Sequence, residues 1–366
     1  MVKICLNMIV KDEAAAIQRC LSSVRPFIDS WVIVDTGSTD GTQDIIRQHL
    51  ASIPGELHER PWRDFGSNRS EAIRLAAGHG DYLLFMDADD ILVAPPNFQF
   101  PELTAGAYQL MIELNELTYW RLALVQQSLG WRYTGVLHEY IECDQTYTVA
   151  KLPGLKILAN ADEVELSEED HIKKYKGHVA ILEKSLLSDP ANARNAFYLA
   201  QSYRDSKQLE ESLAAYRRRL PMGGWEEEIW YSKFQIAELS RRLGRDFDTV
   251  VQAYLEAHEY RPSRAEALTA LARYCRESQR YEMAERFAGD ASKIPLTSDV
   301  LFVDASAYQW RALDELSVAK YWTGDYAGCA ALCRRLLESE HVPADHRERI
   351  ASNLKFAEDK LPQQVS

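Results

Sequence analysis

The stretch Asp81-Tyr-Leu-Leu-Phe-Met-Asp-Ala-Asp-Asp90 places three carboxylates directly after an apolar run. The run at 82–86 has the length and composition of a strand that is buried on both faces. Where such a strand ends, the chain leaves the pleat, so the side chains of Asp87 and Asp89 can turn toward one bound group. Carboxylate oxygens are the ligands that Mg²⁺ and Mn²⁺ prefer. A helix N-cap at Asp89 or Asp90 needs only one acid, so this stretch favours a cation site.

Strand and helix patterns alternate around this stretch through about residue 150. Strands are predicted at 2–8, 30–35 and 57–60, and helices at 12–24, from 41 onward and at 67–77. Buried strands separated by amphipathic helices are typical of a Rossmann-like α/β domain with a mostly parallel sheet. Ligands of such sheets bind beyond the carboxyl ends of the strands. We therefore expect a site where the segments that begin at Asn7, Asp35 and Asp87 meet.

The second of these segments is Asp35-Thr-Gly-Ser-Thr-Asp-Gly-Thr42. Its acids do not have the spacing of an EF-hand, and Gly37 stands where a haloacid-dehalogenase loop would have its second aspartate. The chain contains no P-loop and no GxGxxG motif, which disfavours the NTPase and dinucleotide-binding classes. The segment is interpreted as a polar turn whose aspartate accepts hydrogen bonds from a base or ribose, or as a helix cap at Thr39 or Asp40.

The pattern changes at about Ser167, after which the sequence predicts helix after helix and no strand. Aromatic and small residues recur in pairs of segments, as at 196–203 with 212–216 and at 308–321 with 326–337. The spacing is irregular but close to the ~34 residues of a tetratricopeptide (TPR) unit. We therefore expect an all-α domain built from degenerate helical-hairpin repeats. The segment between, 92–162, gives a mixed pattern and contains Gly130-Trp-Arg-Tyr-Thr-Gly-Val-Leu-His-Glu139.

Composition sets the broad class of the protein. The length of 366 residues suggests two domains. The net charge of −13 makes nucleic acid an unlikely partner, because phosphates are repelled by an acidic surface. No apolar run reaches the ~18 residues of a membrane span, and the N-terminus lacks the pattern of a signal peptide. Six cysteines without a CxxC pair indicate reduced core thiols. Together these features predict a cytoplasmic protein.

Five segments resemble the motifs of family-two glycosyltransferases of the GT-A fold: Asn7–Glu13, Asp35–Thr42, Trp62–Arg69, Asp87–Asp90 and Gly135–Glu139. The helical half resembles the TPR-like extension of one bacterial and viral branch of that family, at 197–203, 223–228, 261–266 and 314–316. The resemblance covers nearly the whole chain. It implies a GT-A catalytic domain over residues 1–165 and an α-helical TPR-like domain over residues 166–366.

The resemblance implies transfer of a hexose or related sugar from a nucleotide-sugar donor, commonly a UDP-sugar, with inversion and with help from Mn²⁺ or Mg²⁺. By their positions in the motifs, the residues expected to bind the donor are Met8, Val10, Glu13, Asp35, Asp64, Arg69 and Asp87. Met8, Val10 and Glu13 would frame the base, and Asp35 would face the uracil or ribose. Asp89 would bind the metal as the second aspartate of the DxD motif.

The reaction also requires a base, because the acceptor hydroxyl loses its proton as it attacks the anomeric carbon. Glu139 is predicted to be that base, with Glu142 and Asp144 as alternatives. His138 is predicted to contact the metal or a phosphate. Relatives often supply a later histidine to the metal, and His171 is the nearest candidate in this sequence.

The resemblance further implies that the helical half helps to bind the acceptor. Tyr198, Gln201 and Trp225 are the candidates, since Tyr and Trp stack on sugars while offering hydrogen bonds. Gly223-Gly224 predicts a tight turn that exposes the Trp225 indole. The acceptor itself, a glycan, a peptide or a small molecule, stays open. An alternative function is a helical-repeat protein-binding module with a degenerate glycosyltransferase half, and a sugar nucleotidyltransferase is a third possibility.

Overall fold

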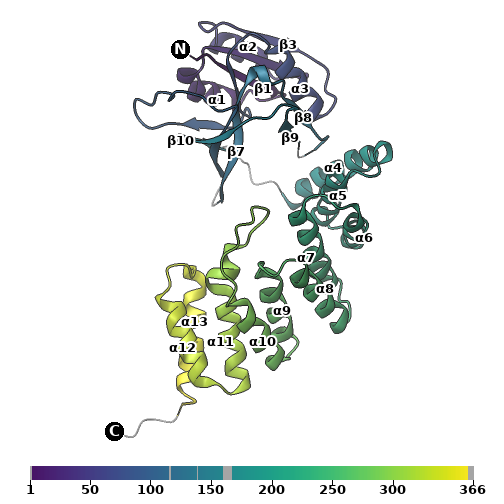
Figure 1. Ribbon diagram of the computed structural model, residues 1–366, viewed down its shortest axis with the longest axis vertical. Coiled ribbons are helices and arrows are strands. Elements are labelled where there is room, and N and C mark those ends of the chain that lie inside the picture. Colours follow the sequence, from purple (N-terminus) through teal and green to yellow (C-terminus); the bar gives the residue numbers. More distant parts are fainter. Residues whose placement is uncertain (1, 115–116, 138, 160–166, 362–366) are drawn as a thin grey trace. The chain divides into compact units, whose positions relative to one another are not determined.

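The computed structural model describes residues 2–114, 117–137, 139–159 and 167–361. The chain divides into two compact units, one of residues 1–174 with 180–185 and one of residues 175–179 with 186–366 (Figure 1). The division falls within the long helix α4 (Glu168–Ser188). The boundary predicted between residues 165 and 166 lies outside the described residues.

The first unit is built on an eight-stranded sheet with the order β3-β2-β1-β4-β7-β6-β10-β5. Its elements are β1 (Ile4–Val10), α1 (Ile17–Val24), η1 (Arg25–Phe27), β2 (Ser30–Asp35), α2 (Thr42–His49), β3 (Gly55–Glu59), α3 (Phe65–Leu75), β4 (Tyr82–Phe85), β5 (Ile91–Val93), β6 (Ala107–Leu114), β7 (Leu117–Gln126), η2 (Gln127–Leu129), β8 (Arg132–Thr134), β9 (Tyr140–Glu142) and β10 (Val149–Leu158). The strands β8 and β9 form a separate antiparallel pair.

The central strand β1 shows why these residues form three layers. Ile4, Leu6 and Met8 point to one face, where they pack with α1 and α2 in the larger apolar core. Cys5 points to the opposite face and packs with Ile73 of α3. Side chains of successive strand residues alternate between the faces of a sheet, and both faces are covered, so the strand is apolar at nearly every position. The predicted α/β domain is confirmed.

The structure differs from the sequence-based expectation at two places. The first helix begins at Ile17 rather than Asp12, because Asp12 has a φ of +53° and its carboxylate accepts a hydrogen bond from the Thr39 amide at 2.8 Å. The mixed segment 92–162 supplies β6, β7 and β10, which extend the sheet. Of these, β7 runs antiparallel to both β4 and β6, so the parallel character is concentrated in β1 to β4.

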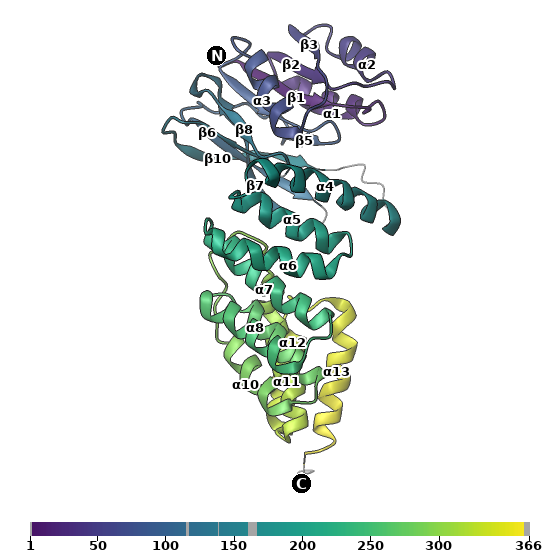
Figure 2. The same ribbon diagram turned by 90° about the vertical axis from the view of Figure 1, so that its right-hand side faces the viewer.

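The second unit is a series of helical hairpins (Figure 2). Its elements are α5 (Ala193–Asp205), α6 (Leu209–Arg219), η3 (Leu220–Met222), α7 (Glu226–Arg242), α8 (Phe247–Tyr260), α9 (Glu266–Glu277), α10 (Tyr281–Ala291), η4 (Ala307–Arg311), α11 (Ala312–Thr323), α12 (Tyr326–Glu338) and α13 (Ala344–Glu358). Small residues such as Ala237, Ala284 and Ala319 are fully buried between the helices. The prediction of a degenerate, TPR-like all-α region is confirmed.

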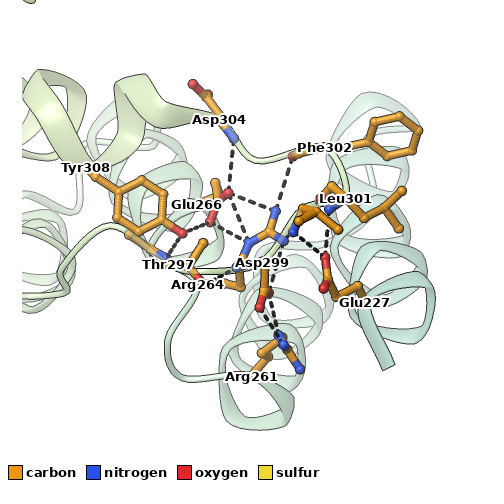
Figure 3. Close-up of polar contacts among 12 residues, drawn as sticks. Glu227, Arg261, Arg264, Glu266, Thr297, Asp299, Leu301, Phe302, Asp304 and Tyr308 are labelled. Atoms are coloured by element: carbon orange, nitrogen blue, oxygen red, sulfur yellow. Dashed lines mark hydrogen bonds and ion pairs between the residues drawn. The ribbon is translucent and has the colours of Figure 1, made fainter. Parts of the chain in front are cut away.

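A buried arginine holds the segment 299–304, which precedes η4, against the helices (Figure 3). Arg264 is fully buried, and its Nη2 lies 2.9 Å from Glu266 Oε1. Its Nη1 donates to Asp299 Oδ2 at 3.3 Å and to the Leu301 carbonyl at 3.2 Å, and Nη2 donates to the Phe302 carbonyl at 3.2 Å. The guanidinium therefore connects α9 to a segment that has no helix or strand of its own.

None of the helices within the described residues is both long enough and apolar enough to cross a membrane.

We expect Arg264→Met to lower the free energy of unfolding of the helical unit by about 3–5 kcal/mol, because it leaves the carboxylates of Glu266 and Asp299 buried beside a side chain without charge. Arg334→Met is the matched control. Arg334 is half exposed and pairs with Glu358 at 2.6 Å, and exposed pairs contribute only about 0–1 kcal/mol. Urea denaturation followed by circular dichroism measures both. Equal losses in the two variants would contradict the importance of the Arg264 contacts.

Candidate active site

A cavity of about 320 Å³ lies at the carboxyl end of β4. Five polar or charged lining residues come from separate parts of the first unit: Arg69 of α3, Asp87 after β4, Arg121 of β7, Tyr133 of β8 and Glu139 before β9. The parallel strands β1, β2 and β4 end at this edge of the sheet. The cavity therefore lies where ligands of parallel α/β sheets bind.

Arg69 connects the two carboxylates of the cavity. Its Nη2 donates to Asp87 Oδ1 at 2.5 Å, and its Nε lies 2.8 Å from Glu139 Oε1. The guanidinium also lies over the ring of Tyr133, 5.6 Å from the centroid. Burial alone would raise the pKa of Asp87, but Arg69 and Arg121 hold it below its usual range. Asp87 is therefore an anion fixed in place beside Glu139.

A close backbone contact brings Glu139 to this position. A Cβ atom on Gly66 would lie 2.2 Å from the carbonyl oxygen of Gly135, so only glycine lets α3 approach the 135–137 turn. One turn further along α3, Ser70 Oγ donates to the Tyr133 carbonyl at 3.1 Å and accepts from the Tyr133 amide at 2.9 Å. These contacts attach the segment 133–139 to the helix that carries Arg69.

The acidic turn after β4 does not cap a helix. It is followed by the strand β5, and Asp90 Oδ2 accepts a hydrogen bond from the Asp87 amide at 3.2 Å within the turn. Burial, with repulsion from Asp87, raises the pKa of Asp90 to about 7. Burial, with repulsion from Asp89 and other acids, also raises the pKa of Glu13 above its usual range. Negative charge thus exceeds positive charge at this turn.

Asp35 ends β2 and is fully buried. Its Oδ1 accepts hydrogen bonds from the amides of Gly37 and Ser38 at 2.9 Å and from Gln43 Nε2 at 3.1 Å. Burial works to raise the pKa of Asp35, but these hydrogen bonds outweigh it and the pKa lies below the usual range. Its Oδ2 is buried and has no hydrogen-bond partner among the described residues. That oxygen is an acceptor that a bound group can use.

The other residues expected to bind a donor lie apart from the cavity. Met8 and Val10 have their side chains in the apolar core of the unit, because β1 is covered on both faces. Asp64 is the N-cap of α3, where its Oδ1 accepts from the Ser67 amide at 2.7 Å. Their proposed contacts with a donor stay predictions.

The two alternative bases are held elsewhere by Arg132. Its Nη2 lies 3.0 Å from Glu142 Oε1 and 2.9 Å from Asp144 Oδ1. Neither acid lines the cavity that contains Glu139. His138 lies outside the described residues, and His171 is exposed in the first turn of α4.

The predicted acceptor-binding residues belong to the helical unit. Tyr198 lies in α5 with the Arg194 guanidinium 5.1 Å from its ring centroid. Gln201 is buried, and its Nε2 has no hydrogen-bond partner among the described residues. Trp225 is 43% exposed after Gly223 and Gly224, whose φ angles are +68° and +91°. The predicted turn and the exposed indole are therefore present, while their role with an acceptor stays a prediction.

Sequence reasoning missed Arg121 and Tyr133. Arg121 lies 3.9 Å from Asp87 Oδ2 and 3.6 Å from Asp90 Oδ2, distances too long for hydrogen bonds. The sequence did single out Arg121, because it is the only lysine or arginine between Arg74 and Arg132. Tyr133 had no comparable signal, since its place depends on the contact between Ser70 and β8.

The acidic turn fits a divalent cation by the chemistry of its donors. Asp87, Asp89 and Glu13 offer hard carboxylate oxygens. Burial raises the pKa of Glu13 most, and repulsion from Asp89 and other acids, which a cation would relieve, raises it further. Among the described residues, no group of three or more His, Cys, Asp or Glu side chains is arranged to hold a metal ion. The donor types fit Mg²⁺ or Mn²⁺.

The cavity lies at the carboxyl end of the parallel strand β4, which is where α/β domains with such sheets bind their ligands. Residues 5–97 match Glycosyl transferase family 2. The matched segment lies within the first unit, and the TPR-like helices follow it in the chain.

Comparison with other proteins gives partial matches. The chain is 30% identical over 132 residues to the lipopolysaccharide core biosynthesis glycosyltransferase LpsC of Rhizobium meliloti, covering 36% of this chain and 43% of LpsC. It is 41% identical over 93 residues to a TPR repeat-containing protein of Synechococcus elongatus, covering 25% and 22%. The matched part thus spans less than half of these curated relatives. The solved structure of BtubC from P. vanneervenii aligns with a TM-score of 0.41 and 15% identity over 54% of this chain and 85% of BtubC.

The raised pKa of Asp90 generates a prediction about stability. The folded protein binds this proton more tightly than the unfolded chain, so stability is lost as the pH rises from about 4 to about 7 and Asp90 ionises. Asp90→Asn should remove this loss and make the folded protein about 2–4 kcal/mol more stable than wild type above pH 7, with little difference near pH 4. Unfolding free energies across this pH range measure the effect.

Asp44→Asn is the matched control for this prediction, because Asp44 is exposed and pairs only with Arg47 at 3.3 Å. Its pH profile should follow the wild type. If Asp90→Asn keeps the wild-type profile as well, Asp90 is not the group responsible.

Proposed function

We propose that the protein is an inverting, metal-dependent glycosyltransferase that moves a sugar from a UDP-sugar to an acceptor hydroxyl. The observation that carries this proposal is the cavity in which Arg69 holds Asp87 of the DxD motif beside Glu139. The reaction needs carboxylates that can hold a cation for the donor diphosphate and a carboxylate near the reacting carbon. The match of residues 5–97 to Glycosyl transferase family 2 supports the same activity.

The nucleoside is proposed to bind at the end of β2. Asp35 Oδ2 is a buried acceptor without a partner among the described residues, and it suits the N–H group of uracil or a ribose hydroxyl. The two amides and the amide side chain that bind Oδ1 fix the orientation of the carboxylate. Binding of a donor group to Oδ2 would satisfy an oxygen that is otherwise costly to bury.

The diphosphate is proposed to lie between the acidic turn and Arg121. Asp87 and Asp89 would hold Mn²⁺ or Mg²⁺, which offsets the negative charge that develops on the leaving diphosphate. Arg121 has only long contacts with Asp87 and Asp90, so its donors can turn to phosphate oxygens. A guanidinium matches the geometry of phosphate oxygens well.

Glu139 is proposed to be the general base. The acceptor oxygen forms a bond to the anomeric carbon, the bond between that carbon and the UDP oxygen breaks, and the acceptor proton passes to Glu139. A single displacement of this kind inverts the anomeric configuration. Arg69 acts as a positioning residue, because its Nε lies 2.8 Å from Glu139 Oε1 and its Nη2 bonds Asp87.

A second candidate function, a helical-repeat binding module with a degenerate catalytic half, is favoured by one observation. The helical unit contains a cavity of about 660 Å³, roughly twice the volume of the cavity beside Asp87. The charged side chains that converge beside Asp87 argue against degeneracy of the first unit. The two functions differ in whether the chain binds UDP.

Calorimetry with UDP, with and without Mn²⁺, tests the proposal directly. We expect the wild type to bind UDP at least tenfold more tightly with Mn²⁺, and Asp89→Ala to lose this gain because the cation loses a carboxylate ligand. Asp44→Ala, which removes an exposed acid of α2, is the control. Absence of binding to UDP and to other nucleoside diphosphates would contradict the glycosyltransferase proposal and favour the helical-repeat binding module.

Glu139→Gln tests the role of the base. We expect UDP release from UDP-sugars to slow by about 10²–10⁴-fold, the typical contribution of general base catalysis, while calorimetry shows unchanged UDP affinity. Glu142→Gln changes an acid that pairs with Arg132 and should retain the wild-type rate. The assignment is wrong if Glu142→Gln is the slower enzyme.

A further inference from the structure

One cavity in the helical unit has no role in the proposed reaction. It has a volume of about 660 Å³ and is lined by α7, α9, α11 and α13 together with residues between 302 and 311. These are the first helices of successive hairpins, and they contribute aromatic and charged side chains along its length. We call this cavity the inner groove.

One wall of the inner groove is fixed by buried charges. Arg264 holds the segment 299–304 through Asp299 and two backbone carbonyl groups. On the other side of this segment, Glu227 Oε2 accepts hydrogen bonds from the amides of Val300 at 2.9 Å and Leu301 at 2.7 Å. Figure 3 shows these contacts converging on the segment while the ring of Phe302 points away from them. Such a wall is rigid before any ligand arrives.

Two backbone irregularities occur in the same wall. Phe302 has a φ of +47°, which is a strained backbone conformation for a bulky residue. The helix that follows begins with a π-helical turn at Ala307–Arg311, which contains Trp310. Strained residues and π-turns concentrate at functional sites. Here they present the half-exposed ring of Phe302 to the groove, whereas the indole of Trp310 is buried behind its lining.

The polar lining of the inner groove is arranged in ion pairs between neighbouring helices. Arg276 of α9 donates to Glu315 of α11 at 2.6 and 3.2 Å. Arg349 of α13 donates to Asp314 of α11 at 3.1 and 2.7 Å. The lining includes five arginines and five acids in total. Its formal charge is therefore close to zero, which gives a polyanion no electrostatic advantage.

These pairs match the hydrogen-bonding character of sugar hydroxyls. A hydroxyl donates one hydrogen bond and accepts others, and an arginine beside a carboxylate offers both partners at adjacent positions. A peptide backbone is better matched by carboxamides, and the lining contains only two, Gln235 and Asn353. The indole Nε1 of the lining residue Trp230 is buried without a hydrogen-bond partner among the described residues. It is a donor that a sugar oxygen can satisfy.

We propose that the inner groove binds a neutral oligosaccharide. The apolar face of a pyranose ring stacks on Phe302, and its hydroxyls bond to the paired side chains Arg276–Glu315 and Asp314–Arg349. If the proposed function holds, this oligosaccharide is the acceptor of the transfer reaction, and that part of the inference rests on the proposed function. The binding itself depends only on the helical unit.

The test is binding of the full chain to a printed array of neutral oligosaccharides, without nucleotide or metal. We expect retention on at least one glycan, with Phe302→Ala and Glu315→Gln each weakening the signal at least tenfold. Phe356→Ala and Glu282→Gln, which remove an exposed phenylalanine and an exposed acid outside the groove, are the matched controls. Circular dichroism melting identifies any variant that has lost its fold.

A second array of immobilised random 12-residue peptides separates the alternatives. Retention on peptides alone, reduced by Phe302→Ala, would make the groove a peptide site and overturn the proposal, as would no retention on any glycan or equal retention by groove and control variants. UDP calorimetry on the same preparation separates the two claims. Glycan binding without UDP binding removes the proposed enzyme function, whereas UDP binding without glycan binding removes only this inference.

Discussion

The first unit depends on one guanidinium placed between two carboxylates. Arg69 holds Asp87 and Glu139 together although they come from segments more than fifty residues apart. Without this guanidinium the two carboxylates would repel each other. The sheet order, the close approach of α3 to Gly135 and the Ser70 contacts all serve this arrangement. A pair of carboxylates joined in this way is a property of the fold and not of either motif alone.

The sequence predicted those helices and strands in which apolar residues recur in a clear pattern. β2 was predicted at its observed bounds, and the acidic turn after β4 was recognised because three acids follow an apolar run. The strands of the segment 92–162 were not predicted from the sequence. β6, β7 and β10 are defined by pairing with other strands, and the identity of a pairing partner leaves no local pattern in the sequence. Arg121 reaches the site only through the antiparallel pairing of β7 with β4. Its importance therefore depends on register, which a single sequence does not reveal.

The two units use buried charge in different ways. At the acidic turn, negative charge exceeds the positive charge of Arg69 and Arg121, and burial together with repulsion raises the pKa of Asp90 and that of Glu13. Around Arg264, the carboxylates of Glu266 and Asp299 have a partner, and the network stabilises a segment that lacks regular structure. A cluster with excess negative charge favours binding of a cation, whereas a balanced network favours rigidity. The same residue types thus produce a binding site in one unit and a fixed wall in the other.

The contact between Gly66 and the Gly135 carbonyl has a consequence for how this cavity can change during evolution. The spacing between α3 and the residue that follows β8 is set by the close approach of the Gly66 backbone to the carbonyl oxygen of Gly135. An exposed lining side chain such as Tyr140 can therefore be exchanged while this backbone contact stays in place. A chain with this frame can acquire a differently lined cavity through single substitutions, while any side chain at position 66 would push α3 away from Gly135.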